Sequence, residues 1–374
     1  MRFSDIIGND ELKETLHKSV KDNHVAHALM FSGREGGANL AMALAFAQFV
    51  NCENPSEKDS CGVCASCVKY EKLIHPDLML IFPTYSASGK DKEKIKAAQL
   101  NTFREFTTKN PYQVYSDWTK ALDAEKKQCI ISVDEGRNIA KNVSLKAFEA
   151  KYKVVLVWLP EFMNQACANS ILKILEEPPE KTLYLLVTND FEKNITTILS
   201  RSQIVNVPLF SDQDISSFLE NKHFVASKRA KQISKYADGS LRNAILMINE
   251  VDEGISSYFI AWMRSCYSAD IEQLVPMADD FTKKSRAEQL STFKYGLDTA
   301  RELLLSNAET EELKRLIDAE ADFLKGFSKV FNTEKIMAFS ELFNEAYYHI
   351  ERNLNSKILF LDLSLSLAKV LRKK

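Results

Sequence analysis

Four of the seven cysteines of this chain lie close together in the sequence. They are Cys52, Cys61, Cys64 and Cys67, and each Cys-x2-Cys step points two sulfurs at a common centre. Gly62 permits the tight turn that such a knuckle needs. Four thiolates at this spacing predict a structural zinc site, because no coordination position is left for water or substrate. A redox dithiol and a coincidental cluster of thiols are the alternatives.

A glycine-rich turn follows the first short apolar run, residues 28–32. Its glycines are Gly33, Gly36 and Gly37, and an alanine-rich stretch that is predicted to be helical comes next. Strand, glycine-rich turn and helix is the arrangement of a phosphate-binding loop. Asn39, however, stands where such a loop has its lysine, and Leu40 stands where it has the hydroxyl that binds Mg²⁺. The loop is therefore predicted to be degenerate and inactive in ATP hydrolysis.

A single carboxylate follows the third long apolar run. Active ATPases of this arrangement place an acidic pair there for Mg²⁺ and water. Here the run 154–159 is followed by Pro160 and then Glu161. We expect Glu161 to be solvated or to cap a helix rather than to act as a base.

The elements that position these residues can be predicted from apolar runs. Runs of strand length occur at 28–32, 78–82, 154–159, 183–188 and 204–207, and helical stretches such as 40–50 and 164–177 lie between them. Apolar strands that alternate with helices indicate a doubly wound parallel sheet, the α/β fold class. Residues 86–127 interrupt this alternation, and we interpret them as an insertion made of a polar loop followed by irregular, helical surface structure.

The part of the chain after Pro208 has a different composition. It contains one proline and four glycines, and apolar residues recur there at helical steps of three and four. The stripe formed by Ile336, Phe339, Phe343, Ala346 and Ile350 is an example. This part is predicted to be all-helical.

The overall charge limits the possible functions. The formal net charge is -2, with 49 basic and 51 acidic residues, which excludes a polybasic protein that binds nucleic acid through bulk charge. No apolar run approaches the roughly 18 residues of a membrane span, and the N-terminus lacks a signal-like apolar segment. We expect a cytoplasmic protein.

Taken together, these residues resemble the clamp-loader branch of the AAA+ proteins, and within it the delta-prime subunits of bacterial DNA polymerase III. Beside the four-cysteine knuckle, three motifs carry the resemblance over about residues 1–250. They are His-Ala-Leu-Met-Phe at 27–31, Leu-Lys-Ile-Leu-Glu-Glu-Pro-Pro at 172–179, and Thr-Asn at 188–189 followed by Ser-Arg-Ser at 200–202. The family's Ser-Arg-Cys motif has Ser202 in its third position here.

The resemblance gives Arg201 and Ser200 a role. It implies that Arg201 is an arginine finger, which would enter the ATP site of a neighbouring subunit and stabilise charge on the γ-phosphate. The less specific alternative is a surface arginine that pairs with an acidic neighbour. Arg242 resembles the sensor-2 arginine of the family's helical lid, and beside a degenerate loop we expect its role to be structural.

The resemblance also implies an organisation and a function. The expected parts are an AAA+ domain with the knuckle at about 52–67 (residues 1–208), a helical lid (209–250) and an oligomerisation collar (251–374). The function would be that of a non-hydrolysing subunit that assembles with gamma/tau and delta subunits and, through them, acts on the sliding clamp and primed DNA. A gamma/tau-like ATPase and a stand-alone zinc-containing DNA-binding module are the alternatives.

Overall fold

The structure is a computed structural model that describes residues 1–85, 92–249, 252–284, 286–307, 327, 330–352 and 354–372. The chain forms two compact units, Met1–Ile245 and Leu246–Lys374. We predicted boundaries at 208/209 and 250/251, whereas the units divide at 245/246, so most of the expected lid groups with the first unit. The first residues of the expected insertion, 86–91, lie outside the described residues. Within the described residues, no helix has the length and apolar character that a membrane span requires.

The first unit is built on a parallel sheet of five strands in the order β2-β3-β4-β1-β5. The strands are β1 (Ala28–Ser32), β2 (Leu78–Ile81), β3 (Lys153–Trp158), β4 (Thr182–Thr188) and β5 (Gln203–Asn206). Each end lies within one residue of the expected run, because continuous apolar stretches suit strands that are buried on both faces. The expected doubly wound parallel sheet is confirmed.

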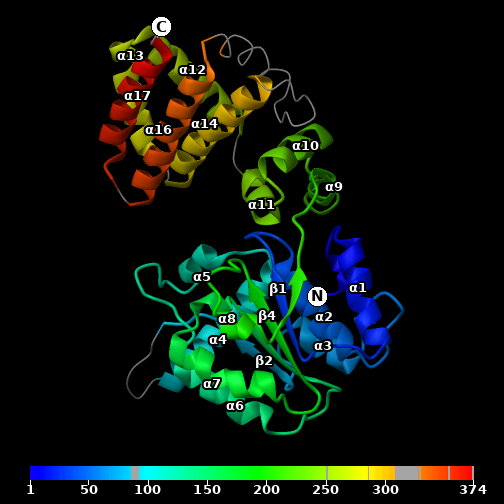
Figure 1. Ribbon diagram of the computed structural model, residues 1–374. Helices are drawn as coiled ribbons and strands as arrows, with labels where there is room; N and C mark the ends of the chain where they lie inside the picture. The colour runs from blue at the N-terminus through cyan, green and yellow to red at the C-terminus, as the bar shows by residue number, and fades with distance from the viewer. Residues whose placement is uncertain are drawn as a thin grey trace. The chain divides into compact units, whose positions relative to one another are not determined.

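Helices cover both faces of this sheet (Figure 1). On one face, side chains of α6 and α7 pack against those of Met30, Val155 and Leu186 from three strands. On the other face lies α2, whose twelve residues are all buried. The helical elements of this unit are η1 (Phe3–Asp5), α1 (Asp10–Lys21), α2 (Asn39–Val50), α3 (Ala65–Glu71), α4 (Lys92–Lys109), α5 (Tyr115–Ala121), α6 (Val133–Val143), η2 (Pro160–Phe162), α7 (Gln165–Glu176), α8 (Thr196–Leu199), α9 (Asp212–His223), α10 (Ser227–Tyr236) and α11 (Leu241–Asn249), which crosses the division between the units.

Residues 92–127 correct the expectation of a surface insertion. They form α4 and α5, and Phe103 and Trp118 are fully buried. The ring of Phe103 stacks on that of Phe82 at 4.0 Å and meets the ring of Trp158 at 5.5 Å. Aromatic rings buried in this way contribute both area and ring contacts to a core, so this segment belongs to the core of the first unit.

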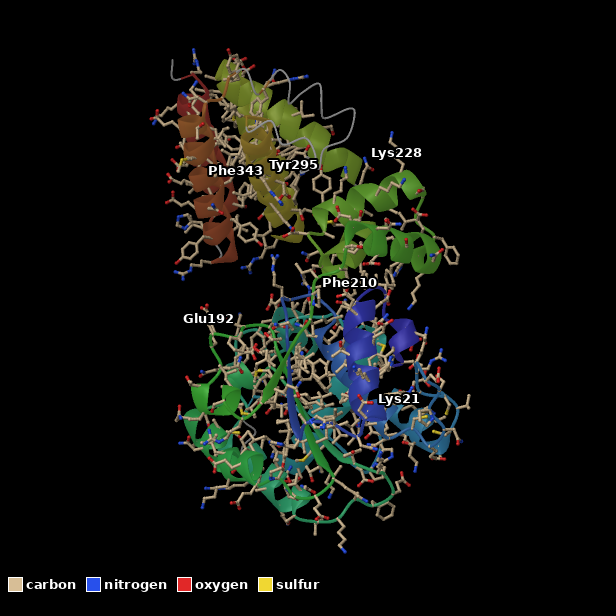
Figure 2. All side chains as sticks on the ribbon, turned by 45° about the vertical axis from the view of Figure 1, so that its right-hand side comes forward. Lys21, Glu192, Phe210, Lys228, Tyr295 and Phe343 are labelled. Atoms are coloured by element: carbon tan, nitrogen blue, oxygen red, sulfur yellow. The ribbon has the colours of Figure 1, made fainter. Side chains whose placement is uncertain are left out.

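The second unit consists of helices wherever it is described, as the composition after Pro208 predicts. They are α12 (Asp252–Ser268), α13 (Ile271–Lys283), α14 (Arg286–Asn307), α16 (Thr333–Glu351) and α17 (Ser356–Arg372). The expected apolar stripe of α16 is buried throughout. Trp262 stacks on Phe360 at 4.4 Å, and its indole N–H donates to Ser364 Oγ at 2.8 Å. Figure 2 shows Phe343 among these helices, where its ring lies against Phe259 and Trp262.

Candidate functional site

The glycine-rich loop lies where a phosphate loop is expected, between the carboxyl end of β1 and the start of α2. Gly36 has a φ of +77°, which favours glycine. Its carbonyl accepts the N–H of Leu241 at 2.9 Å, and a side chain at this position would collide with Ser240. The loop is thus packed against the turn that precedes α11.

The side chain of Asn39 occupies the inside of this loop. It is 3% exposed, and its Nδ2 donates to the carbonyl of Gly33 at 2.8 Å and to Asn189 Oδ1 at 3.0 Å. The carbonyls of Arg34 and Thr188 lie 3.3 and 3.4 Å from the same nitrogen. In a phosphate loop the lysine at this position points at the β- and γ-phosphates. The Asn39 amide instead joins the loop to itself and to the end of β4.

Glu161 is half-buried, whereas we expected a solvated or helix-capping residue. It lies in η2, its Oε2 atom is buried, and its Oε1 accepts the N–H of Asn189 at 3.1 Å. Burial raises the pKa of its carboxyl group. Glu161, Asn189 and Asn39 therefore form a polar chain behind the loop. Glu161 and Asn39 are 122 residues apart, so no local pattern predicts this chain.

Arg201 lies at the opposite end of the sheet from the loop. It comes just before β5, whose first residue, Gln203, is in register with Leu29 near the start of β1. The glycine-rich loop follows the last residue of the parallel strand β1, about 10 Å further along the strand direction. An arginine at the amino end of the strands therefore lies away from the chain's own loop.

In this chain Arg201 is paired with an acidic residue, as the alternative of a surface arginine with an acidic neighbour predicts. Its guanidinium forms an ion pair with Glu176 at the end of α7, with Nε 2.8 Å from Oε1. Nη1 also donates to the carbonyl of Thr197 at 2.9 Å and to Ser200 Oγ at 3.1 Å. The side chain remains 30% exposed. The partners hold the guanidinium in one orientation while leaving part of it accessible.

The four cysteines converge, as the knuckle prediction requires. All four sulfurs lie within 4.8 Å of one another, and those of Cys61 and Cys67 are 3.9 Å apart. Tetrahedral zinc with bonds of about 2.3 Å holds sulfurs about 3.8 Å apart. Cys64 caps α3, and Gly62 has a φ of +74° in the turn. The residues fit a closed tetrathiolate site.

Backbone N–H groups within the knuckle point at sulfur atoms. The N–H groups of Val63 and Cys64 lower the pKa of Cys61 to about 6, whereas burial raises that of Cys67. Donors of this kind stabilise thiolates, which are the form that binds a metal. Asp59 fixes the knuckle to the N-terminus because it accepts the backbone N–H groups of Phe3 and Ser4 at 3.1 and 2.9 Å.

Arg242 has the structural contacts expected of it. Its guanidinium meets the carboxylate of Asp117 with two hydrogen bonds of 2.6 Å, which join α11 to α5. Asp117 was missed by the sequence analysis, because its partner lies 125 residues away and no motif marks it. This ion pair therefore connects α5, which follows the knuckle in the sequence, with α11, which follows the last strand of the sheet.

Comparison with known proteins identifies the family. A family model described as "DNA polymerase III, delta subunit" matches residues 8–211, more than half of the chain. The chain belongs to this family. The match covers the sheet, the knuckle, the loop and Arg201, and it leaves the second unit outside.

Several gamma and tau subunits of DNA polymerase III are similar in sequence to this chain. The tau/gamma subunit of Haemophilus influenzae is 26% identical over 283 residues, which cover 72% of this chain and 35% of that protein. The tau subunit of Escherichia coli K12 is 26% identical over 260 residues, which cover 68% of this chain and 33% of that protein. The chain spans about a third of the length of these relatives.

Among solved structures, a gamma subunit-related protein of DNA polymerase III from Thermotoga maritima is 16% identical. The alignment covers 96% of this chain and 100% of that chain, with a TM-score of 0.39. The RuvB branch migration motor from the same organism is 12% identical, covers 67% of this chain and 64% of that chain, and has a TM-score of 0.40. Similarity at these sequence identities and TM-scores gives no information about the function of this chain.

Proposed function

We propose that this chain is a delta-prime type subunit of a DNA polymerase III clamp loader. In this role it does not hydrolyse ATP, completes the loader ring with gamma/tau and delta subunits, and supplies Arg201 to the ATP site of an adjacent gamma/tau subunit. Through the assembled loader it would help to place a sliding clamp on primed DNA. Its family and its tau/gamma relatives support the loader assignment.

The observation that carries the non-hydrolysing assignment is the Asn39 side chain. A buried amide bonded to the carbonyl of Gly33 and to Asn189 supplies no positive charge for phosphate. Leu40 offers no oxygen for Mg²⁺. Phosphoryl transfer depends on both contributions, so the loop lacks the groups that the reaction needs.

The placement of Arg201 supports action in trans. The guanidinium lies at the amino end of the strands, whereas the chain's own loop lies at their carboxyl end. Docking against a neighbour's nucleotide would exchange the Glu176 carboxylate for phosphate oxygens, which bind the planar guanidinium in a similar forked geometry. Glu176 is then a positioning residue that holds the arginine before assembly.

Exposed apolar side chains of the second unit support a collar. On α13, Ile271 and Val275 share one face at a spacing of four residues, and on α17 Ile358 and Leu365 share one face at a spacing of seven. All four are exposed. Apolar faces of packed helices that point to solvent are typical of subunit contacts, which suits the proposed assembly with other loader subunits.

The knuckle would hold one structural zinc ion through its four cysteines. The ion would cross-link the segment after α2 to the start of α3, a region of short loops with little apolar core of its own. All four ligands come from the protein, so the metal would take no part in a reaction.

A gamma/tau-like ATPase is the second candidate, because the relatives named above are tau and gamma subunits. The two candidates differ in a direct measurement. A delta-prime type chain should show no ATP hydrolysis above background, and no tight nucleotide binding, when purified alone. ATP hydrolysis by the wild-type chain that is lost in Asn39→Ala would favour the gamma/tau-like ATPase.

The trans role can be tested in a reconstituted loader. Arg201→Ala should lower clamp- and DNA-stimulated ATP hydrolysis at the adjacent site by about 10³-fold, the lower range for arginine fingers. Arg137→Ala, which alters an exposed arginine that pairs with Asp134 in its own helix, is the matched control. Both loaders should assemble equally by size-exclusion chromatography. An unchanged rate in the Arg201→Ala loader would refute the trans role.

A further inference from the structure

Three lysines share the solvent face of α10. Lys228, Lys231 and Lys235 follow one another at steps of three and four residues, so they lie on one side of this helix. The buried residues Ile233 and Ala237 lie on the opposite side. Lys228 and Lys231 are exposed and Lys235 is half-buried, and Figure 2 shows the Lys228 side chain extending from α10 into solvent. We call these three lysines the lysine face.

The lysine face contains no acidic residue. α10 has four basic residues and no carboxylate in its sequence, and within the described part of the chain no lysine of this face forms an ion pair. Asp238, three residues after Lys235, pairs instead with Arg34 at 3.4 Å. The remaining acidic residues of this pair of helices all belong to α9: Asp212, Asp214 and Glu220. The positive charge of the lysine face is therefore complementary to a polyanion.

An exposed phenylalanine lies beside the lysine face. Phe224 is 89% exposed and lies between the end of α9 and the start of α10, four residues before Lys228. Four residues span at most about 14 Å, so one ligand can reach both side chains. The N–H of Phe224 donates to the carbonyl of Leu219, and its φ is +54°, a conformation in which glycine is usual at the end of a helix. The backbone therefore fixes the place of this ring at the end of α9.

These two features together favour a single-stranded nucleic acid as the ligand. The ammonium group of lysine binds phosphate as a point charge. The lysine face extends over about 10 Å of helix at 1.5 Å per residue, which is long enough to meet more than one phosphate of a strand. An exposed aromatic ring stacks on the face of an unpaired base, whereas the bases of a duplex are covered by their neighbours. An acidic protein segment would satisfy the lysines but offers no base for Phe224.

We propose that the lysine face of α10 and Phe224 form a binding site for single-stranded nucleic acid. The three lysines contact successive phosphates, and the ring of Phe224 stacks on one base. The contacts do not read the sequence, because every base has a face on which an aromatic ring can stack. The net charge of the whole chain is -2, so attraction comes from this local patch and binding is weak and sensitive to salt. The inference does not rest on the proposed loader function.

The test uses the full chain and a fluorescein-labelled oligonucleotide of twelve thymidines, whose binding is followed by anisotropy. Saturable binding is expected at low salt with a Kd of about 10⁻⁶ to 10⁻⁴ M. For single strands the logarithm of the binding constant falls by about 0.7 per phosphate contact for each decade of salt, so three contacts predict a slope of about -2. An unlabelled peptide of twelve glutamates should displace the probe at least about tenfold less effectively than the unlabelled oligonucleotide.

Two variants separate the phosphate contacts from the stacking contact. Lys228→Ala/Lys231→Ala/Lys235→Ala should weaken binding at least about tenfold at low salt and bring the salt slope close to zero. Phe224→Ala should weaken binding at least about fivefold at every salt concentration and leave the slope unchanged. Thermal melting checks that both variants fold. Lys228→Ala/Lys231→Ala, which should lower the slope by about two thirds, replaces the triple variant should that variant not fold.

Each variant has a matched control in the same unit. Lys18→Ala/Lys21→Ala removes two exposed lysines of α1, and Phe148→Ala removes a phenylalanine that is 82% exposed. Both controls should change binding less than about twofold and leave the salt slope unchanged.

Several outcomes would overturn the proposal. One is the absence of saturable binding at low salt, and another is a salt slope that the triple lysine variant does not change. Equal loss of affinity in Phe148→Ala and Phe224→Ala would refute stacking at Phe224. Equal displacement by the glutamate peptide would identify a site for acidic protein segments instead. The assays of ATP hydrolysis described above do not involve this site, so failure of the loader assignment and failure of this proposal are distinguishable.

Discussion

Replacing Asn39 with alanine tests whether its amide holds the glycine-rich loop in place. The side chain is almost completely buried at the start of α2 and connects β1, the loop and the end of β4. Alanine keeps the helix propensity at this position but removes the donor. The carbonyl of Gly33 and the side-chain oxygen of Asn189 then lose their common partner.

The expected cost follows from these two contacts. A buried acceptor left without its donor costs about 1–3 kcal/mol, so two acceptors at 2.8 and 3.0 Å together imply about 2–6 kcal/mol. A urea dependence of roughly 2–3 kcal/mol/M converts this loss into a shift of about 0.7–3 M in the unfolding midpoint.

The assay must report on the first unit alone. Trp118 and Trp158 lie in the first unit, and Trp262 lies in the second. Tryptophan fluorescence in a Trp262→Phe background therefore follows unfolding of the sheet and its helices. Asn169→Ala, at an exposed position of α7, is the matched control and should change the free energy of unfolding by less than about 0.5 kcal/mol.

A midpoint shift in Asn39→Ala no larger than that of the control would refute this reasoning. It would mean that the loop keeps its conformation without the amide, and that water replaces the lost donor at little cost. The inactivity of the loop would then have to be attributed to the missing lysine and hydroxyl alone. A gain of ATP binding by the variant would show instead that the amide excludes nucleotide.

The purified chain should contain about one zinc ion by elemental analysis, and Cys61→Ser or a strong chelator should release it and lower the melting temperature. Gly296→Ala should destabilise the second unit by about 1–3 kcal/mol in thermal melting, because the new methyl group would lie 2.5 Å from the ring of Phe343. Burial alone would raise the pKa of Asp77, but N–H groups of residues 148–150 outweigh it and hold the pKa below its usual value. The stabilisation from Asp77 is therefore present above about pH 4 and lost as the pH falls through the lower folded-state pKa, so wild type should lose more stability than Asp77→Asn between about pH 5 and pH 3 in urea titrations.

Each of these expectations has a matched control. Cys129→Ala should leave the zinc content unchanged, and a loss of zinc in this variant would contradict the assignment of the ligands. The double variant Gly296→Ala/Phe343→Leu should be less destabilised than the two single changes predict by addition, and simple additivity would contradict the proposed clash. Asp22→Asn changes an exposed aspartate, and a pH dependence equal to that of Asp77→Asn would contradict the role of Asp77.

Local sequence determined the elements of this protein. The five strands lie within one residue of the apolar runs, and the stripe of α16 is buried as its spacing predicts. Burial on both faces of a parallel sheet requires continuous apolar runs, and burial of one helix face requires steps of three and four. The cysteine spacing and the residues at the loop are likewise local, so the convergence of the thiols and the missing lysine were evident before the structure.

Tertiary structure alone decided which distant residues meet. Phe103 belongs to the core because its ring meets Trp158, which comes from β3. The carboxylate of Glu161 meets the N–H of Asn189, and Arg201 is paired with Glu176, which ends another helix. Such contacts depend on how the chain packs across dozens of residues, and no period of two or 3.6 residues encodes them. The place of β2 at one end of the described sheet also became known only with the strand order, because an apolar run looks the same at the edge of a sheet as at its centre.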